Sequence, residues 1–306
     1  MLDLELQSEQ IDPKREEKRI KLEKLRARNL ANGGKPPVPK LRVLSLGWGV
    51  QSFTLAAMSA LGELPKLDLI IHADTTWERA ATYKFADKWQ PWLEAHGLEV
   101  VSASSLSARK MEKNSNRIFI PALFLGQRGP GQLRRQCTSR WKIDVVHQLI
   151  SQELAQRGQT KKAGVVEQWL GISWDEASRA KSSPVQYITT RHPFLETDTR
   201  MTRAECIKWL TAHELEIPVK SSCTHCVYHN QANWQAMKRE NGADWGQAVY
   251  FDGLIRAAST KIGRQLFIHP SLRPLAESVP LPEEVGYTQP DLIDGPGCDS
   301  AGYCWD

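Results

Sequence analysis

The residues of this chain with the clearest potential for chemistry are its six cysteines: Cys137, Cys206, Cys223, Cys226, Cys298 and Cys304. Cys223 and Cys226 form a Cys-x-x-Cys pair, and two thiolates at this spacing can bind one metal ion or one edge of a cluster. The spacing alone leaves zinc, an iron–sulfur cluster and a redox dithiol open. Cys206 falls within an expected helix, which favours plain core packing.

The other cysteines have different surroundings. Cys137 follows Arg134 and Arg135, whose positive charges favour the thiolate form. Cys298 and Cys304 lie near the end of the sequence. A terminal thiol could act as a nucleophile or persulfide carrier, and it could equally tie down the tail or supply a further ligand. A zinc site would need a fourth ligand, for which the candidates are His225, His229, Cys298 and Cys304.

A second candidate site is the glycine-containing segment 45–52, with the sequence SLGWGVQS. It lies between an expected strand and an expected helix, where small residues let the backbone approach an anion and the first helical amides bind phosphate. It contains no lysine and matches neither GxxxxGK[ST] nor GxGxxG. A plain structural turn therefore stays open, but polar residues after the next strand (ADTTWE, 73–78) favour a ligand site at this sheet edge.

These segments require a fold that brings strand ends together. The apolar pattern predicts strands over 41–46, 67–73, 98–102 and 167–173 and helices over 51–61, 80–96, 140–156 and 202–213. Strands that alternate with helices form βαβ units with right-handed crossovers. We therefore expect an α/β fold with a Rossmann-like parallel sheet flanked by helices. Residues 103–136, rich in Ser, Arg and Gly, are expected to form an irregular region on the substrate side.

Three regions are expected along the chain. Residues 1–40 form a charged helical arm and linker, 41–230 a nucleotide-binding α/β domain with the cysteine cluster, and 231–306 a helical and irregular extension that carries the cysteine-containing tail. Between 14 and 28, the arm has eight basic residues against three glutamates. A solvated helix and a nucleic-acid contact are both open interpretations of this charge.

Composition excludes several classes of protein. Hydrophobic residues make up 41% and charged residues 25% of the chain, which is typical of a globular protein. The apolar runs are too short to span a bilayer, and the first residues contain no secretory signal. We therefore expect a cytoplasmic protein without a membrane partner, whose reduced thiols serve metal or redox chemistry. The net charge of +5 permits an anionic partner, and the oligomeric state stays open.

Four segments together resemble a known family. Residues 47–52 are similar to the pyrophosphate-binding loop of the adenine nucleotide α-hydrolase (PP-loop ATP pyrophosphatase) superfamily, Ser-Gly-Gly-x-Asp-Ser, of which Gly49 and Ser52 match. Gln51 replaces the aspartate. Segments 73–78, 134–142 and 170–179 resemble, in order, the Asp-Thr-Gly, Cys-Thr-x-x-x-Lys and Gly-Ile-Arg-x-x-Glu-Ser-x-x-Arg segments of the phosphoadenylyl-sulfate (PAPS) reductase-like branch. Their order and spacing over roughly 41–230 carry the resemblance.

The resemblance implies a set of site residues. It implies an adenine nucleotide, ATP in our leading hypothesis, bound by Ser45, Gly47, Trp48, Gly49, Val50, Gln51, Ser52, Asp74, Gly171, Ile172 and Ser173, with Mg²⁺ as a further candidate cofactor. Arg135, Lys142 and Arg179 are expected to stabilise the departing pyrophosphate, and Cys304 is a candidate catalytic thiol. Cys137 is expected to approach Cys223 and Cys226 so that the three hold a [4Fe-4S] cluster, with zinc as the alternative.

The leading hypothesis is therefore an ATP-dependent sulfurtransferase. The enzyme would adenylate an acceptor with release of pyrophosphate and then insert sulfur, with tRNA or DNA as candidate acceptors and a sulfur or electron donor protein as a partner. The alternative is a reductase of adenylyl sulfate or phosphoadenylyl sulfate. A second alternative is a non-catalytic nucleic-acid-binding protein with structural zinc.

Overall fold

The computed structural model describes residues 38–105, 118–127, 129–240 and 242–280, with the side chains of 259–262 excepted. It also describes six positions of the arm, all helical: Glu17, Ile20, Lys21, Glu23, Lys24 and Ala27. These positions agree with the predicted helical arm. Cys298 and Cys304 lie outside the described residues, so their predicted roles stay predictions.

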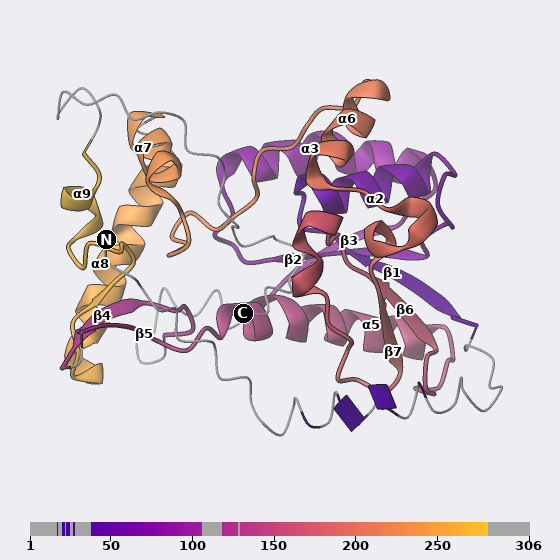
Figure 1. The fold of residues 1–306 in the computed structure, drawn as a ribbon, viewed down its shortest axis with the longest axis horizontal. Helices are drawn as coiled ribbons and strands as arrows, with labels where there is room; N and C mark the ends of the chain where they lie inside the picture. Colours follow the sequence, from indigo (N-terminus) through magenta and orange to yellow (C-terminus); the bar gives the residue numbers. More distant parts are fainter. Residues whose placement is uncertain are drawn as a thin grey trace.

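A five-stranded parallel sheet forms the centre of the fold (Figure 1). Its strands are β1 (Leu41–Ser45), β2 (Leu69–Asp74), β3 (Val100–Ser104), β6 (Val166–Trp169) and β7 (Ile188–Arg191). Their order is β3-β2-β1-β6-β7, and each neighbouring pair is parallel. The expected Rossmann-like sheet is therefore confirmed. The strand order reverses between β1 and β6, the place where such sheets bind ligands at their carboxyl edge.

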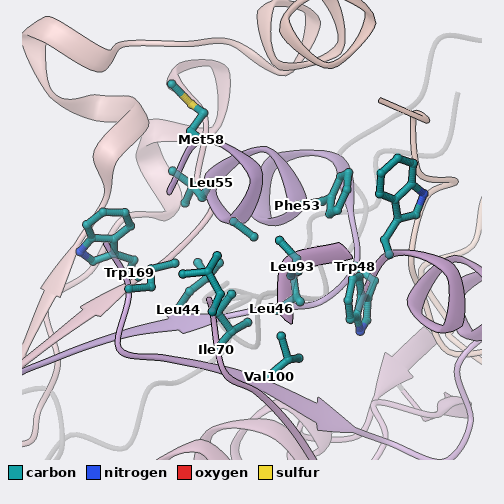
Figure 2. Packing of buried hydrophobic residues seen from close by; sticks show 14 of the residues in the cluster. Leu44, Leu46, Trp48, Phe53, Leu55, Met58, Ile70, Leu93, Val100 and Trp169 are labelled. Atoms are coloured by element: carbon teal, nitrogen blue, oxygen red, sulfur yellow. The ribbon is translucent and has the colours of Figure 1, made fainter. Parts of the chain in front are cut away.

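Helices cover both faces of this sheet (Figure 1). On one face lie α2 (Val50–Ala60), α3 (Ala80–Ala95) and α6 (Arg203–Ala212), and on the other lies α5 (Asp144–Gln156). Successive strand residues point to opposite faces. Leu44 and Ile70 accordingly pack toward α2 (Figure 2), whereas Val43 and Ile71 join Ile150 of α5. The apolar strands thus bury both faces, as a parallel sheet requires.

A smaller apolar cluster joins residues that are distant in sequence. It contains α7 (Gln231–Glu240), α8 (Ala243–Ile262), α9 (Leu275–Ser278) and a three-stranded sheet of β5 (Gly129–Gln132), β4 (Leu123–Gly126) and β8 (Leu266–Phe267). The expectation that 103–136 is irregular is therefore wrong for 123–132, where β4 and β5 pair antiparallel. The GPGQ sequence of β5 has turn-like composition. Gly131 is needed there because an added Cβ would lie 2.7 Å from the ring of Phe124.

The remaining elements are short and carry much of the candidate site. A π-helix, η1 (Thr138–Ile143), leads directly into α5. A 3₁₀ helix, η2 (Trp174–Arg179), lies between β6 and β7, and two 3₁₀ turns, η3 (Pro193–Leu195) and η4 (Thr197–Thr199), follow β7. The capping box predicted at Thr202 and Glu205 begins α6. The strand predicted over 167–173 ends at Trp169. None of the described helices combines the length and the apolar character needed to cross a bilayer.

Candidate functional site

The glycine-containing turn after β1 is a closed, well-packed structure. Trp48 takes the left-handed conformation, with φ of 57°, which a bulky residue rarely adopts. Its ring is 1% exposed and packs near Phe53, Phe85 and His72. Figure 2 shows Trp48 and Phe53 among the buried residues of this core cluster. The ring thus belongs to the core, and burial of the indole offsets the strained backbone.

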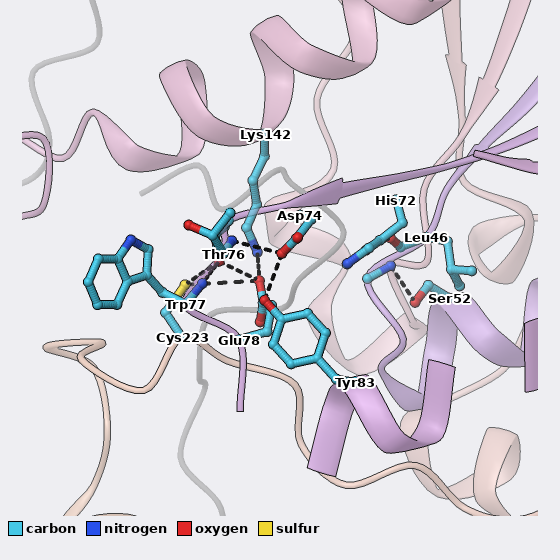
Figure 3. Close-up of polar contacts among 12 residues, drawn as sticks. Leu46, Ser52, His72, Asp74, Thr76, Trp77, Glu78, Tyr83, Lys142 and Cys223 are labelled. Carbon is cyan, nitrogen blue, oxygen red and sulfur yellow. Dashed lines mark hydrogen bonds and ion pairs between the residues drawn. The ribbon is translucent and has the colours of Figure 1, made fainter. Parts of the chain in front are cut away.

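Ser52 holds the turn together rather than pointing away from it. Its hydroxyl accepts from the amide of Gly47 at 3.3 Å and donates to the carbonyl of Gly49 at 3.3 Å. Ser52 is labelled in Figure 3. Gly49 is the N-cap of α2, and no side chain caps this end. The first amides of an uncapped helix, together with its dipole, are suited to an anion. The phosphate-binding potential of the turn therefore lies in the backbone of 50–52.

The segment after β6 packs directly on the start of α2. An added Cβ on Gly171 would lie 2.7 Å from the Ser52 amide nitrogen and 2.9 Å from its Cα. Only glycine allows this approach, since both atoms are backbone. Gln168 donates to the Ser45 hydroxyl at 2.8 Å and ties β6 to β1. The predicted residues 45–52 and 171–173 are therefore brought together at the reversal of strand order.

A carboxylate lies beside this helix start. Gln51 donates to Glu176 at 3.3 Å and to the Ser173 hydroxyl at 3.4 Å, and Glu176 pairs with Arg179 at 2.6 Å. Glu176 is negative, as a phosphate would be, and the helix dipole favours it at this end. The side-chain amide of Gln51 can donate to Glu176, whereas a carboxylate at this position would repel it. Arg179 thus lies near the turn, as predicted.

Asp74 ends β2 and organises the polar residues that follow (Figure 3). One of its carboxylate oxygens accepts from the Thr76 amide at 2.7 Å and from the Tyr83 hydroxyl at 2.8 Å. Burial, followed by the hydrogen bond to Asp74, raises the pKa of Tyr83 above its usual value. Thr76 takes a left-handed backbone with φ of 64°. The hydrogen bond from the Thr76 amide makes Asp74 part of the turn after β2. Its side chain is half-buried at the edge of the sheet where the nucleotide is predicted to bind.

The three predicted cluster cysteines line one small cavity, which we call the thiol cavity. Its volume is about 40 Å³, and the polar residues among its walls are Thr75, Arg135, Cys137, Thr138, Trp141, Lys142, Ser222, Cys223, His225, Cys226 and Tyr228. Cys137 begins η1, and the cavity-lining positions 137, 138, 141 and 142 share one face of that helix. Cys137 thus lines the same cavity as Cys223 and Cys226, and its role as a third ligand stays a prediction.

The Cys-x-x-Cys turn is held against the segment after β2. The Thr224 amide donates to the Trp77 carbonyl at 2.8 Å, and Glu78 forms an isolated bridge with Cys223. The Cys226 amide closes the turn on the Cys223 carbonyl at 3.1 Å. These backbone contacts fix the two cysteines beside the carboxyl end of β2. Sequence spacing gave no sign of this pairing.

A buried carboxylate is the main polar feature beside Cys223 (Figure 3). Glu78 accepts from the Thr75 hydroxyl at 3.1 Å and pairs with Lys142 at 3.5 Å. The sulfur of Cys223 lies 3.3 Å from the Thr75 hydroxyl and 4.0 Å from Glu78. Burial and then the charge of Glu78 raise the pKa of the Cys223 thiol, against the effect of Lys142. The thiol is therefore neutral until a stronger cation than Lys142 binds it.

Sequence reasoning missed Thr75, Glu78 and Trp141 as site residues. Thr75 and Glu78 belong to the polar segment 73–78, so their position after a strand was an available signal. Trp141 carried none, because tryptophan in a helix usually packs in the core. Both Trp141 and His225 are 1% exposed. Burial, followed by the nearby His229, lowers the pKa of His225 to about 3, so its ring is neutral.

The predicted residues thus form two groups along one sheet edge. Arg135 and Lys142 line the thiol cavity, whereas Arg179 lies at the glycine turn. The joint action of the three cations on a pyrophosphate stays a prediction. His72 connects the groups, because its ring contacts the Leu46 carbonyl at 3.0 Å. Burial lowers the pKa of His72, and the charges of Glu78, Asp74 and Lys142 act on it as well.

The metal-ligating side chains around the thiol cavity fit the two predicted metal centres unequally. Among the described residues, no three side chains of His, Cys, Asp or Glu are arranged to hold one metal ion. A zinc ion needs four donors at about 2.0–2.3 Å, so the described residues give the zinc alternative no support. Three thiols around one cavity are the donors that iron–sulfur clusters use. Buried Trp141 Nε1 and His225 Nδ1, which have no hydrogen-bond partner in the described structure, also fit a sulfide-bearing group.

No protein-family model and no curated protein sequence matches the chain. Among solved structures, the chain is similar to phosphoadenylyl-sulfate (PAPS) reductase from Candida auris, solved as a phosphate complex. The sequence identity is 14% and the TM-score 0.34, over 64% of this chain and 81% of that chain. The fold class itself rests on the order and direction of the sheet strands.

Proposed function

We propose that this chain is an ATP-dependent sulfurtransferase whose thiol cavity holds the sulfur and whose glycine turn binds the nucleotide. The observation that carries the proposal is that Cys137, Cys223 and Cys226 share one cavity with Arg135 and Lys142. That cavity lies beside the carboxyl end of β2, the neighbour of β1 in the sheet. Sulfur chemistry and nucleotide binding would thus use one sheet edge.

The nucleotide phosphates are proposed to bind the uncapped start of α2. Backbone amides of 50–52 and the helix dipole supply the attraction. Glu176 must leave this position, since its carboxylate would repel a phosphate. Its departure frees Arg179, now 2.6 Å from Glu176, to stabilise the pyrophosphate. Asp74 is half-buried at the neighbouring strand end and is the proposed ligand for Mg²⁺ or the ribose.

The proposed [4Fe-4S] cluster would be held by Cys137, Cys223 and Cys226. When bound, it would supply an iron site that binds sulfide. The cavity of about 40 Å³ holds roughly three water-sized spheres, so its walls must move apart to admit such a group. Lys142 and Arg135 would balance the negative charge of the thiolates. The raised pKa of the Cys223 thiol implies that loading releases a proton.

The reaction is proposed to proceed in two balanced steps. A carbonyl oxygen of the acceptor attacks the α-phosphorus of ATP, forming an oxygen–phosphorus bond while pyrophosphate leaves. Hydrosulfide, the co-reactant, then attacks the activated carbon. The carbon–oxygen bond breaks, AMP leaves with that oxygen, and a proton is released to solvent. One oxygen is replaced by one sulfur without net oxidation, so the proposed chemistry needs no external reductant.

The acceptor is proposed to be a nucleic acid, either tRNA or DNA. The arm between 14 and 28 carries eight basic residues against three glutamates. Basic helices attract phosphate backbones through counterion release, which makes binding fall as salt rises. A sulfur donor protein would serve as the source of hydrosulfide.

The test uses protein purified without oxygen and incubated with ATP, sodium sulfide and either tRNA or DNA. Pyrophosphate release and thionucleoside in the digested nucleic acid are the two measurements. Cys223→Ser is expected to abolish sulfur incorporation while nucleotide binding persists, and Ser52→Ala is expected to slow pyrophosphate release. Cys206→Ala is the control, because Cys206 is 0% exposed in α6 and lines no part of the thiol cavity.

Two outcomes would replace the proposal. Release of sulfite from adenylyl sulfate or phosphoadenylyl sulfate with a thiol, and without pyrophosphate, would indicate a reductase. Salt-sensitive binding of nucleic acid with no nucleotide turnover would indicate a non-catalytic binding protein. Equal activity of Cys223→Ser and Cys206→Ala would remove the thiol cavity from the mechanism.

A further inference from the structure

Two nitrogen atoms beside the thiol cavity lack hydrogen-bond partners. Trp141 and His225 both line the cavity and are each 1% exposed. Trp141 Nε1 and His225 Nδ1 have no partner in the described part of the chain. Most buried polar groups in proteins are hydrogen-bonded, so two orphans at one small cavity need an explanation.

The surroundings of the two rings explain why no protein group serves them. His225 stacks on Phe251 with ring centres 3.6 Å apart and planes 10° apart. The edges of Trp77 and Trp141 lie against the same imidazole, at 5.3 Å and 6.1 Å. Aromatic walls hold both rings in place but offer no strong acceptor. No described protein group accepts a hydrogen bond from either nitrogen, so an occupant of the cavity can supply the acceptor.

The hydrogen-bond donors around the cavity limit the chemical class of the ligand that can bind there. An indole N–H is only a donor, so Trp141 requires an acceptor. The cavity already brings three sulfur atoms and the ammonium of Lys142 together. Cationic and N–H groups around sulfur select a negatively charged sulfur species, since hydrogen bonds to charged acceptors are the stronger ones. A cationic ligand would leave Trp141 unsatisfied, and a neutral acceptor would form a weaker hydrogen bond than an anionic one.

We propose that Trp141 and His225 are positioning residues that donate hydrogen bonds to anionic sulfur held in the thiol cavity. This rests on the proposed function but adds two residues to it. The anionic sulfur is either a sulfide of the cluster or free hydrosulfide, and both offer the same acceptor. Hydrogen bonds to the sulfurs of a cluster raise its reduction potential by stabilising the more negative, reduced form.

The test compares Trp141→Phe with Trp234→Phe. Trp234 is a matched control because it is 0% exposed, belongs to the same apolar cluster and also has an unpartnered Nε1, yet does not line the cavity. Both substitutions keep a ring and delete one orphan donor. The full-length proteins are purified without oxygen, and iron and acid-labile sulfide are measured first. Equal cluster content in the three proteins then allows their midpoint potentials to be compared.

The proposal expects a lower midpoint potential in Trp141→Phe and an unchanged one in Trp234→Phe. It also expects that the rise in melting temperature on loading is smaller for Trp141→Phe alone. His225→Phe, which keeps the stack on Phe251, should lower the potential as well. Equal potentials in wild type and Trp141→Phe at equal loading would overturn the proposal. So would the same shift in both tryptophan variants.

A second experiment tests the hydrogen bonds to anionic sulfur without the cluster. If the protein binds no iron even after reconstitution, the metal-free chain is titrated with sodium sulfide and its melting temperature followed, with sodium chloride as the control salt. A rise that Trp141→Phe loses and Trp234→Phe keeps supports anionic sulfur in the cavity, although the cluster is then rejected. No rise in the wild type overturns the inference.

Discussion

The glycine turn and the thiol cavity lie on one sheet edge but are built in opposite ways. At the turn, Ser52 pairs with the backbone of Gly47 and Gly49, and Gln51 donates to Glu176. The Nε1 of Trp48, which is buried in the core, has no partner in the described structure. At the cavity, buried Trp141 and His225 are left without partners. The paired polar groups of the turn need no ligand, whereas the orphan donors of residues that line a cavity gain stability when a ligand binds there.

The comparison assigns different work to the two regions. The turn needs a movement of Glu176 before it can accept a phosphate, so its affinity includes the cost of breaking the Glu176–Arg179 pair. The cavity needs an occupant to complete its hydrogen bonds. We therefore expect that binding of a ligand in the cavity raises the stability of the protein. At the turn, we expect that turnover depends on replacement of the Glu176 carboxylate by a phosphate.

The largest effect is expected from Lys142→Met at the cavity. Glu78 has a side chain 1% exposed and Lys142 one 12% exposed, so the substitution leaves a buried carboxylate without its cation. Loss of one partner of a buried pair costs about 3–5 kcal/mol. Urea unfolding measures the difference. Lys88→Met, which breaks an exposed pair with Glu216, should cost less than about 1 kcal/mol. Similar losses in both would contradict a buried pair at the cavity.

The next effect tests close packing at the turn. Gly171→Ala puts a Cβ 2.7 Å from the backbone of Ser52, and overpacking of this kind costs about 1–3 kcal/mol. Gly253→Ala in α8 is the control, because nothing lies within 4 Å of its added Cβ. A helix interior favours alanine over glycine, so that control should gain up to about 1 kcal/mol. Opposite signs in urea unfolding support the packing, and a neutral Gly171→Ala would contradict it.

Acid sensitivity at the sheet edge is tested at His192, while His225 and His229 near the cavity, whose pKa values are also lowered by burial, stay unchanged as a common background. Burial lowers the pKa of His192, which follows β7, to about 4, below an unfolded value near 6.5. The unfolded chain therefore binds this proton first, and stability falls as pH drops from about 6.5 toward 4. Between pH 6.5 and 5 the loss is up to about 2 kcal/mol. His192→Phe should lessen the difference in urea midpoint between pH 7 and 5. An unchanged difference would assign the acid sensitivity elsewhere.

The smallest effect concerns the contact of Gln51 with Glu176. Gln51→Glu sets two carboxylates against each other, which should cost about 1 kcal/mol because Arg179 offsets part of the repulsion. Gln90→Glu makes the same change beside Glu94 on an exposed helix surface. A like-charge pair there should cost about 0.2–0.5 kcal/mol. Urea unfolding at pH 7 compares the two, and an equal cost would mean that the turn is solvated.

Much of the fold could be predicted from local pattern. The runs around β1, β2 and β3 are apolar and bounded by turns, and the capping box at Thr202 begins α6 where it was expected. Such signals act over a few residues, so they survive without knowledge of the rest of the chain. The β4–β5 hairpin could not be found in this way, because its glycines look like turn residues until Phe124 is placed over Gly131.

The candidate site, too, could be predicted from the sequence only in part. The motif order predicted that the turn, Gly171 and Ser173 would meet and that Cys137 would join Cys223 and Cys226. It also predicted that Arg179 would act together with Arg135 and Lys142. The structure places Arg179 at the turn and the other two at the cavity, and their joint action stays a prediction. Charge alone could not decide this, because a salt bridge with Glu176 holds Arg179 at the turn.

By itself, the sequence determined the parallel α/β class, the strand ends that carry polar groups and the identity of the thiols, because these depend on short-range periodicity and residue chemistry. Only the tertiary structure decided that Glu78 neighbours Cys223, that Trp48 is a core residue and that Trp141 and His225 lie unpartnered beside the cysteines. Burial and pairing are properties of contacts between distant segments. They arise when β2, η1 and the Cys-x-x-Cys turn meet, and no single segment encodes them.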